Sequence, residues 1–136
     1  MSTSTLPKYA HEGDAGLDLY SRLDCILAPF DRIAVPTGIA VSIPEGYAGF
    51  IQPRSGLAVK YGITVLNTPG LIDSGYRGEI KVILINLNPK ENFVIRRGNR
   101  IAQFVIQKVE NVEVEVVEEL DETTRGEKGF GSSGLN

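Results

Sequence analysis

The stretch PTGIAVSIPEGYAGFIQP, residues 36–53, decides the fold class of this chain. Within it, Ile39, Val41 and Ile43 alternate with smaller residues, which is the two-residue period of a strand with one face on a core. Prolines at positions 36, 44 and 53 interrupt the stretch before a helical period can be sustained. The stretch therefore predicts short strands separated by turns.

The same pattern extends along the chain in both directions. Further prolines stand at positions 29, 69 and 89, and Val112, Val114 and Val116 alternate with mostly acidic residues, which predicts a second half-buried strand. Residues 79–87 and 101–109 are richer in β-branched residues with little alternation, so we expect central strands covered on both faces. Glycine (15) and proline (7), spread along the chain, indicate many short elements joined by turns.

Only residues 55–61 carry a helix signal, with Ser55 able to cap the first turn and Gly62 able to end it. The fold class predicted is therefore all-β, a jelly-roll-like barrel or sandwich with one short helix. From Asp121 the apolar pattern stops, and residues 125–134 hold four glycines. We expect a β domain over 1–124 and a flexible C-terminal arm over 125–136.

Composition excludes several classes of function. A net charge of -3 argues against a nucleic-acid polymer as partner. Cys25 and His11 are the only cysteine and histidine, so neither a disulfide framework nor the zinc site of a nucleotide deaminase can be assembled within the chain. The phosphate-binding motif G-x-x-x-x-G-K-[ST] is missing, and no apolar run has membrane-spanning length. We expect a soluble, cytoplasmic protein.

Three polar positions interrupt otherwise structural patterns. Arg54, in the stretch PRSGLA (53–58), comes between a strand and the predicted helix, which is typical either of an anion site or of an ordinary turn with a surface arginine. Gln103 interrupts an apolar run, so its amide either bonds a ligand shell or sits on a wet face. Asp18 follows Ala15-Gly16-Leu17 near the start, where a carboxylate can hold metal-bound water or close a turn.

Residues 67–80, NTPGLIDSGYRGEI, hold turn signals around a short apolar step, which predicts a tight hairpin that presents backbone groups to a planar ligand. Asp73 can accept a proton from water there, or simply bond within its own turn. Tyr76 is either a ligand platform or a core aromatic. Near the C-terminus, Phe130 lies between two glycines, where it can stack on a base beside the positive charge of Arg125, unless the tail is inert.

Taken in order, five segments resemble the five motifs of the trimeric deoxyuridine triphosphatase family, and the match spans nearly the whole chain. The segments are AGLDL (15–19), PRSGLAVKYGI (53–63), NTPGLIDSGYRGEI (67–80), RRGNRIAQFVI (96–106) and RGEKGFGSSG (125–134). Five ordered motifs are far more specific than any one of them.

The resemblance implies a jelly-roll subunit of a homotrimer, with each active site built from three chains and closed by the arm. It implies Mg²⁺-dependent hydrolysis of dUTP to dUMP and pyrophosphate, which limits uracil incorporation into DNA and supplies dUMP for dTMP synthesis. The fifth motif usually has glycine where this chain has Lys128, which bears on closure of the arm. A relative of dCTP deaminase and a non-catalytic nucleotide-binding module are the alternatives.

The resemblance also assigns roles by position. Asp73 would deprotonate the attacking water, Gln103 would help to position it, and Asp18 would bind the hydration shell of the metal. The residues expected to contact phosphates are Arg54, Ser55 and Gly56. Those expected to read uracil and sugar are Asn67, Gly70, Leu71, Ile72 and Asp73, with Tyr76 under the deoxyribose to exclude ribose and Lys81 reaching the ligand as well. The lid would consist of Arg125, Phe130, Gly131, Ser132 and Ser133.

Overall fold

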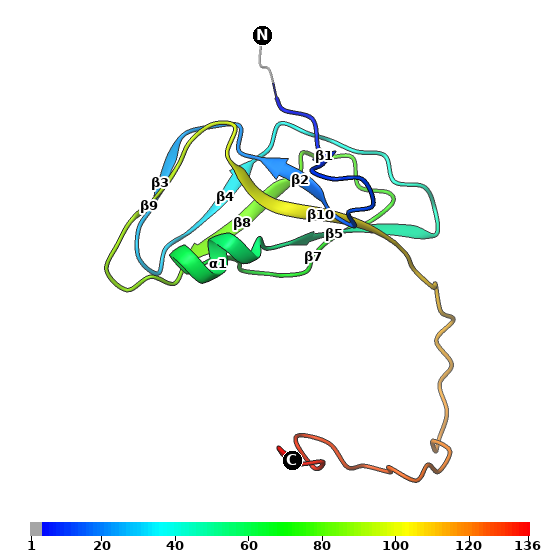
Figure 1. The fold of residues 1–136 in the computed structure, drawn as a ribbon. Helices are drawn as coiled ribbons and strands as arrows, with labels where there is room; N and C mark the ends of the chain where they lie inside the picture. The colour runs from blue at the N-terminus through cyan, green and yellow to red at the C-terminus, as the bar shows by residue number, and fades with distance from the viewer. Residues whose placement is uncertain (1–3) are drawn as a thin grey trace.

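The computed structural model describes residues 4–136, and its regular elements are antiparallel strands together with α1 (Ser55–Tyr61), the one helix in that range (Figure 1). The strands, in chain order, are β1 (Lys8–Tyr9), β2 (Leu17–Tyr20), β3 (Cys25–Leu27), β4 (Arg32–Pro36), β5 (Tyr47–Gln52), β6 (Ile63–Val65), β7 (Gly70–Ile72), β8 (Lys81–Asn86), β9 (Phe93–Ile95) and β10 (Arg100–Lys108). The prediction of an all-β chain with one short helix is confirmed.

The strands form three sheets around one core. The largest has five strands in the order β1-β2-β10-β5-β7, a second has the order β4-β8-β6, and β3 pairs with β9. All three sheets contribute side chains to a single apolar cluster, for example Phe104 from β10, Leu84 from β8 and Leu27 from β3. As predicted, β8 and β10 are central strands of their sheets. The side chains of β8 alternate between buried and partly buried, and residues 106–108 at the end of β10 are exposed, so the predicted cover on both faces was wrong there.

Helix α1 has the predicted bounds, but its first turn is not capped as predicted. Arg54, not Ser55, occupies the N-cap position with an extended backbone, and no side chain caps the turn. Ser55 as cap was wrong because the chain becomes helical at the serine itself. The end was predicted correctly, since Gly62 adopts φ 69° and its N–H donates to the carbonyl of Ala58.

Two predicted strands are not paired strands in the described chain. Residues 39–43 keep the alternation, with Ile43 buried and Ser42 exposed, but no strand runs there. Residues 112–117 also form no strand, and Val112, Val114 and Val116 are 81%, 85% and 93% exposed. The half-buried strand predicted over 112–117 was therefore wrong for a single chain. The boundary at 124 stays a prediction; the last strand ends at Lys108.

One polar side chain lies at the centre of the fold. Asn86 at the end of β8 is fully buried, and its Nδ2 donates to the carbonyls of Leu27 at 3.0 Å and Glu91 at 2.9 Å. Its Oδ1 accepts the N–H of Asn88 at 2.9 Å. The amide therefore ties β8 to β3 and to the loop before β9.

We expect Asn86→Ala to lower the free energy of unfolding by about 3 kcal/mol, because three backbone groups lose their partner inside the protein. Urea unfolding of the variant measures the change. Asn92→Ala, at an exposed position in the same loop, is the control and should leave the midpoint near that of the wild type. Equal midpoints for both variants would contradict a structural role for Asn86.

The structure has no helix long and apolar enough to cross a membrane within residues 4–136.

Candidate active site

Arg54 lies against the first residue of β10. Its guanidinium Nη1 donates to the carbonyl of Arg100 at 3.1 Å, which holds the side chain of this N-cap residue against the start of β10. Helix α1 starts directly after it, and Ser55 and Gly56 are exposed there. A guanidinium beside exposed hydroxyl and backbone groups suits the oxygens of a phosphate. This geometry fits the predicted anion site.

Gln103 joins the same region from the middle of β10. Its backbone pairs with Asp18 of β2 on one side and with β5 on the other. Its half-buried amide Nε2 donates to the carbonyl of Pro53 at 3.4 Å, so the side chain bonds the loop that carries Arg54. Gly16 approaches it closely, because a Cβ there would lie 2.8 Å from Oε1 of Gln103.

The carboxylate of Asp18 is buried within β2, so the alternative that it closes a turn was wrong. Its Oδ2 lies 3.6 Å from Nη1 of Arg100. An open pocket of about 530 Å³ lies beside it, with the basic side chains of Lys8 and Arg100 in its wall. We call Asp18, Arg54, Arg100 and Gln103 the Asp18 cluster. It gathers three of the five motifs around β10.

Residues 67–80, here called the Asp73 loop, belong to another part of the five-stranded sheet. Strand β7 within it pairs with β5 and forms the sheet edge, while the neighbouring β6 pairs with β8 in a different sheet. The predicted tight hairpin was therefore wrong, because β7 pairs outside the segment. In the sheet order, β5 separates β7 from β10. The free edge of β7 nevertheless presents backbone groups, as predicted.

Asp73 follows β7 directly and starts a turn in which its carbonyl accepts the N–H of Tyr76 at 3.1 Å. Its side chain is exposed, and among residues 4–136 its carboxylate has no hydrogen bond or ion pair. The alternative of a side-chain bond within its own turn is therefore wrong. An exposed carboxylate without a partner can accept a proton from water.

Tyr76 is not a core aromatic. It is 43% exposed, and its hydroxyl donates to the carbonyl of Glu79 at 2.9 Å. Asn67 lies close to Gly70, since a Cβ at Gly70 would come 3.4 Å from Nδ2 of Asn67. Within the Asp73 loop, Asn67 thus lies beside Gly70, and Asp73 starts the turn that carries Tyr76.

Leu71 and Ile72 of the Asp73 loop, and Lys81 just after it, complete the residues expected to contact the ligand. Leu71 points outward on β7, whereas Ile72 packs against the core. Lys81 is exposed at the start of β8, where it lines a pocket of about 380 Å³ together with Arg22 and Glu79. Its contact with a ligand stays a prediction.

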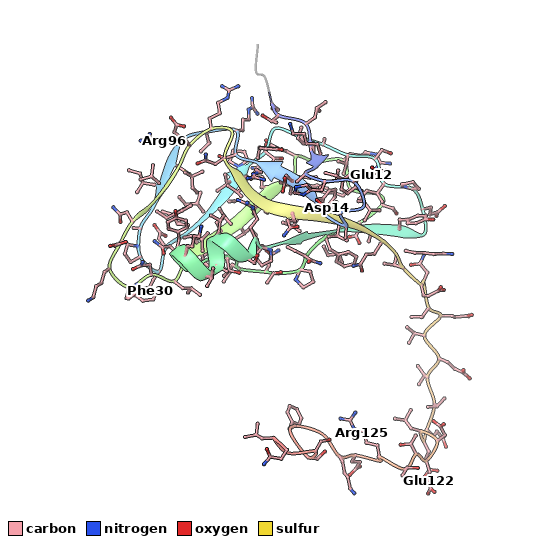
Figure 2. All side chains as sticks on the ribbon, viewed as in Figure 1. Glu12, Asp14, Phe30, Arg96, Glu122 and Arg125 are labelled. Carbon is pink, nitrogen blue, oxygen red and sulfur yellow. The ribbon has the colours of Figure 1, made fainter. Side chains whose placement is uncertain are left out.

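The C-terminal arm stands apart from both groups. Figures 1 and 2 show the chain leaving β10 and running away from the body, with Arg125 near its far end. The Arg125 Nε donates to the carbonyl of Lys128 at 2.8 Å, while Phe130 is fully exposed and Gly131 turns the backbone at φ 83°. Ser132 and Ser133 are exposed as well. Within one chain, the predicted site residues thus fall into three separate groups.

Sequence reasoning missed Arg100, although the residue lies in one of the quoted segments. Its side chain pairs with Asp18 and its carbonyl accepts from Arg54, so it connects two motifs. The only signal in the sequence is its place three residues before Gln103 on the same strand. Cys25, in contrast, offers no nucleophile, because burial and, to a smaller extent, the charge of Asp24 raise the pKa of its thiol.

Comparison with known proteins places these motifs in one class. The family model described as dUTPase matches residues 2–134. The deoxyuridine 5'-triphosphate nucleotidohydrolase of Corynebacterium glutamicum is 57% identical over 129 residues, which is 95% of this chain and 87% of that one. The corresponding protein of Mycolicibacterium vanbaalenii is 58% identical over 134 residues, again with 95% and 87% covered. Both relatives are nucleotidohydrolases.

Solved structures similar to this chain are dUTPases as well. A variant dUTPase of Staphylococcus bacteriophage 80alpha with dUpNHpp superimposes with a TM-score of 0.90 at 33% identity, over 97% of this chain and 93% of that one. A variant dUTPase from phage phi11 of S. aureus gives 0.79 at 29% identity, over 85% and 91%, and its structure describes the coordination of a structural Mg(II) ion. The chain belongs to the dUTPase family, and its jelly-roll-like fold is confirmed with it.

The donor set of the chain allows one mode of magnesium binding. Within the described residues no group of three or more acidic, histidine or cysteine side chains could hold a metal ion. Asp18 offers a single carboxylate beside an open pocket. Because Mg²⁺ keeps several waters and often binds through one carboxylate together with substrate phosphates, this set fits a water-mediated site and not a cage of protein ligands.

Proposed function

We propose that the chain hydrolyses dUTP to dUMP and pyrophosphate, with Asp73 as the general base. The proton of a water molecule passes to the carboxylate while the water oxygen attacks the α-phosphorus. The bond from that phosphorus to the oxygen bridging to the β-phosphate breaks, and pyrophosphate leaves. The observation that carries the role is the exposed, unpartnered carboxylate of Asp73 next to the free edge of β7.

The edge of β7 is where we place the uracil. The backbone N–H and C=O groups of β7 that do not pair with β5, with the amide of Asn67, can pair with the base. Thymine would add a methyl group, which a rigid strand edge rejects sterically. Cytosine would present reversed hydrogen-bond polarity and leave buried groups unpaired. Tyr76 would pack under the deoxyribose and leave no room for a 2′-hydroxyl.

The phosphates would bind at the Asp18 cluster. The guanidinium of Arg54 is the first positive charge, and Ser55 and Gly56 add a hydroxyl and a backbone N–H. Gln103, already bonded to the loop that carries Arg54, would position the phosphates or the water. Magnesium, when bound through water to Asp18, supplies neutralisation of the phosphate charge. Arg125 would complete the neutralisation from the arm.

The separation of the three groups supports a homotrimer with shared sites. The Asp18 cluster, the Asp73 loop and the arm carry complementary parts of one reaction, yet they lie apart within one chain. The exposed valines of residues 112–117 form an apolar stripe of the kind that packs against another chain. We propose that neighbouring copies supply these partners. The trimer would act in the cytoplasm. By hydrolysing dUTP it would limit uracil incorporation into DNA and supply dUMP for dTMP synthesis.

Incubation with each deoxynucleoside triphosphate and Mg²⁺ tests this function. We expect pyrophosphate release from dUTP alone, with dCTP and dTTP slower by at least about 100-fold, because β7 reads the base through both shape and hydrogen bonds. Chromatography of the reaction products identifies dUMP. Comparable turnover of dCTP or dTTP would refute the placement of the base on β7.

A further inference from the structure

The ring of Tyr76 is held by its far end. Its hydroxyl donates to the carbonyl of Glu79, three residues further along the chain, so the ring lies against the intervening Gly78. Nearly half of the side chain stays exposed, which leaves the ring open to a ligand. The position of the ring therefore depends on the residue against its hydroxyl end, which is Gly78.

Gly78 provides the space for that end of the ring. A Cβ at this position would lie 2.6 Å from Cζ and 2.9 Å from Cε1 of Tyr76, and closer still to the hydroxyl oxygen. The φ of Gly78 lies outside the left-handed region, so an alanine would fit its backbone. The requirement for glycine here is thus steric and comes from Tyr76.

The acceptor of the Tyr76 hydroxyl is anchored independently. The carboxylate of Glu79 accepts the N–H of Gly38 at 2.8 Å and lies 3.8 Å from Nη1 of Arg22. The next residue, Ile80, is bonded to the same segment, and its carbonyl accepts Oγ1 of Thr37 at 2.6 Å. With the backbone fixed on this side, a side chain at position 78 would displace the exposed ring and not the chain.

We propose that Gly78 is a specificity-determining positioning residue. It leaves the space in which the Tyr76 ring settles onto the Glu79 carbonyl, and the ring fixed in this way excludes a 2′-hydroxyl from the sugar site. This inference rests on the proposed place of Tyr76 under the deoxyribose. Displacing the ring changes the sugar site while Asp73 and the Asp18 cluster keep their positions.

The test compares kcat and KM for dUTP and UTP in Gly78→Ala and in the wild type. We expect the ratio of kcat/KM for dUTP over UTP to fall about tenfold, mainly through KM. Gly75→Ala is the matched control, because a Cβ at Gly75 meets nothing within 4 Å in the same loop. It should keep the wild-type ratio, and thermal unfolding should show both variants folded. An equal fall in both variants would overturn the inference.

Two substitutions of Tyr76 separate this inference from the role on which it depends. Tyr76→Phe removes the bond to Glu79 without adding bulk, and we expect a smaller fall in the same ratio; it also carries the test if Gly78→Ala does not fold. Tyr76→Ala removes the ring itself. If only Tyr76→Ala changes the ratio, the positioning role of Gly78 is refuted while the place of Tyr76 stands. If Tyr76→Ala leaves the ratio unchanged, both fail.

Discussion

We expect the replacement of Asp73 by asparagine to lower kcat for dUTP by about a thousandfold, within the range for loss of a general base. The carboxylate has no hydrogen bond or ion pair within residues 4–136, so the substitution breaks no contact that holds the loop. Asparagine has the same shape but cannot accept the proton of the attacking water. Substrate binding should survive, because the base and the phosphates are held by other groups.

Pyrophosphate release gives kcat, and calorimetric titration with the non-hydrolysable analogue dUpNHpp gives the affinity. We expect the dissociation constant to stay within about threefold of the wild type, since Asp73 is expected to bind the substrate only weakly. Asp121→Asn, an exposed aspartate that loses the same charge, is the control. Turnover retained in Asp73→Asn would exclude Asp73 as the base.

The elements that were predicted correctly are those whose sequence signals lie within the element or next to it. Helix α1 was placed with its observed bounds because Ser55 was read as its start and Gly62, which can adopt a left-handed φ, as its end. The central position of β10 also followed from its dense β-branched composition. The cap at Ser55 failed because a serine that is itself helical cannot act as the cap.

Alternation alone predicted which side chains face a core but not which strand lies next to them. Residues 39–43 keep the expected alternation of burial without forming a strand. Residues 112–117 have the same pattern and bury nothing within the chain. Pairing partners are non-local, so the sequence of one strand does not contain them. For the same reason, the sequence did not predict that β7 pairs with β5 and not within its own segment.

The candidate site shows the same limit. Ordered motifs identified its residues, but they did not reveal that one chain divides them into three groups, because this depends on sheet order. Arg100 and Gly78 emerged only from contacts across the fold, an ion pair to Asp18 and a space under Tyr76. A surface arginine and a loop glycine have no distinguishing signal in sequence.

Truncation after Thr124 should lower kcat/KM for dUTP by about a thousandfold while the protein remains folded. Among residues 4–136, the deleted part bonds to the rest only through the N–H of Gly126, which donates to Oγ1 of Thr123 at 3.1 Å, so the strands and the core lose no hydrogen bond. On the proposed roles, the truncation would lose the stacking of Phe130 on the base, on the order of 1–3 kcal/mol, together with the charge of Arg125 on the phosphates. Water also enters a site that the arm would otherwise cover.

Light scattering after gel filtration gives the oligomeric state, and initial rates give kcat/KM. A chain truncated after Gly134 is the matched control, because it loses only Leu135 and Asn136 and keeps the whole fifth motif. We expect that control to be fully active and both truncated chains to stay trimeric. Since the exposed valines precede the deletion, they remain available to a neighbouring chain. A monomer after the longer truncation would show that the arm holds the assembly together, and full activity would show that it does not close the site.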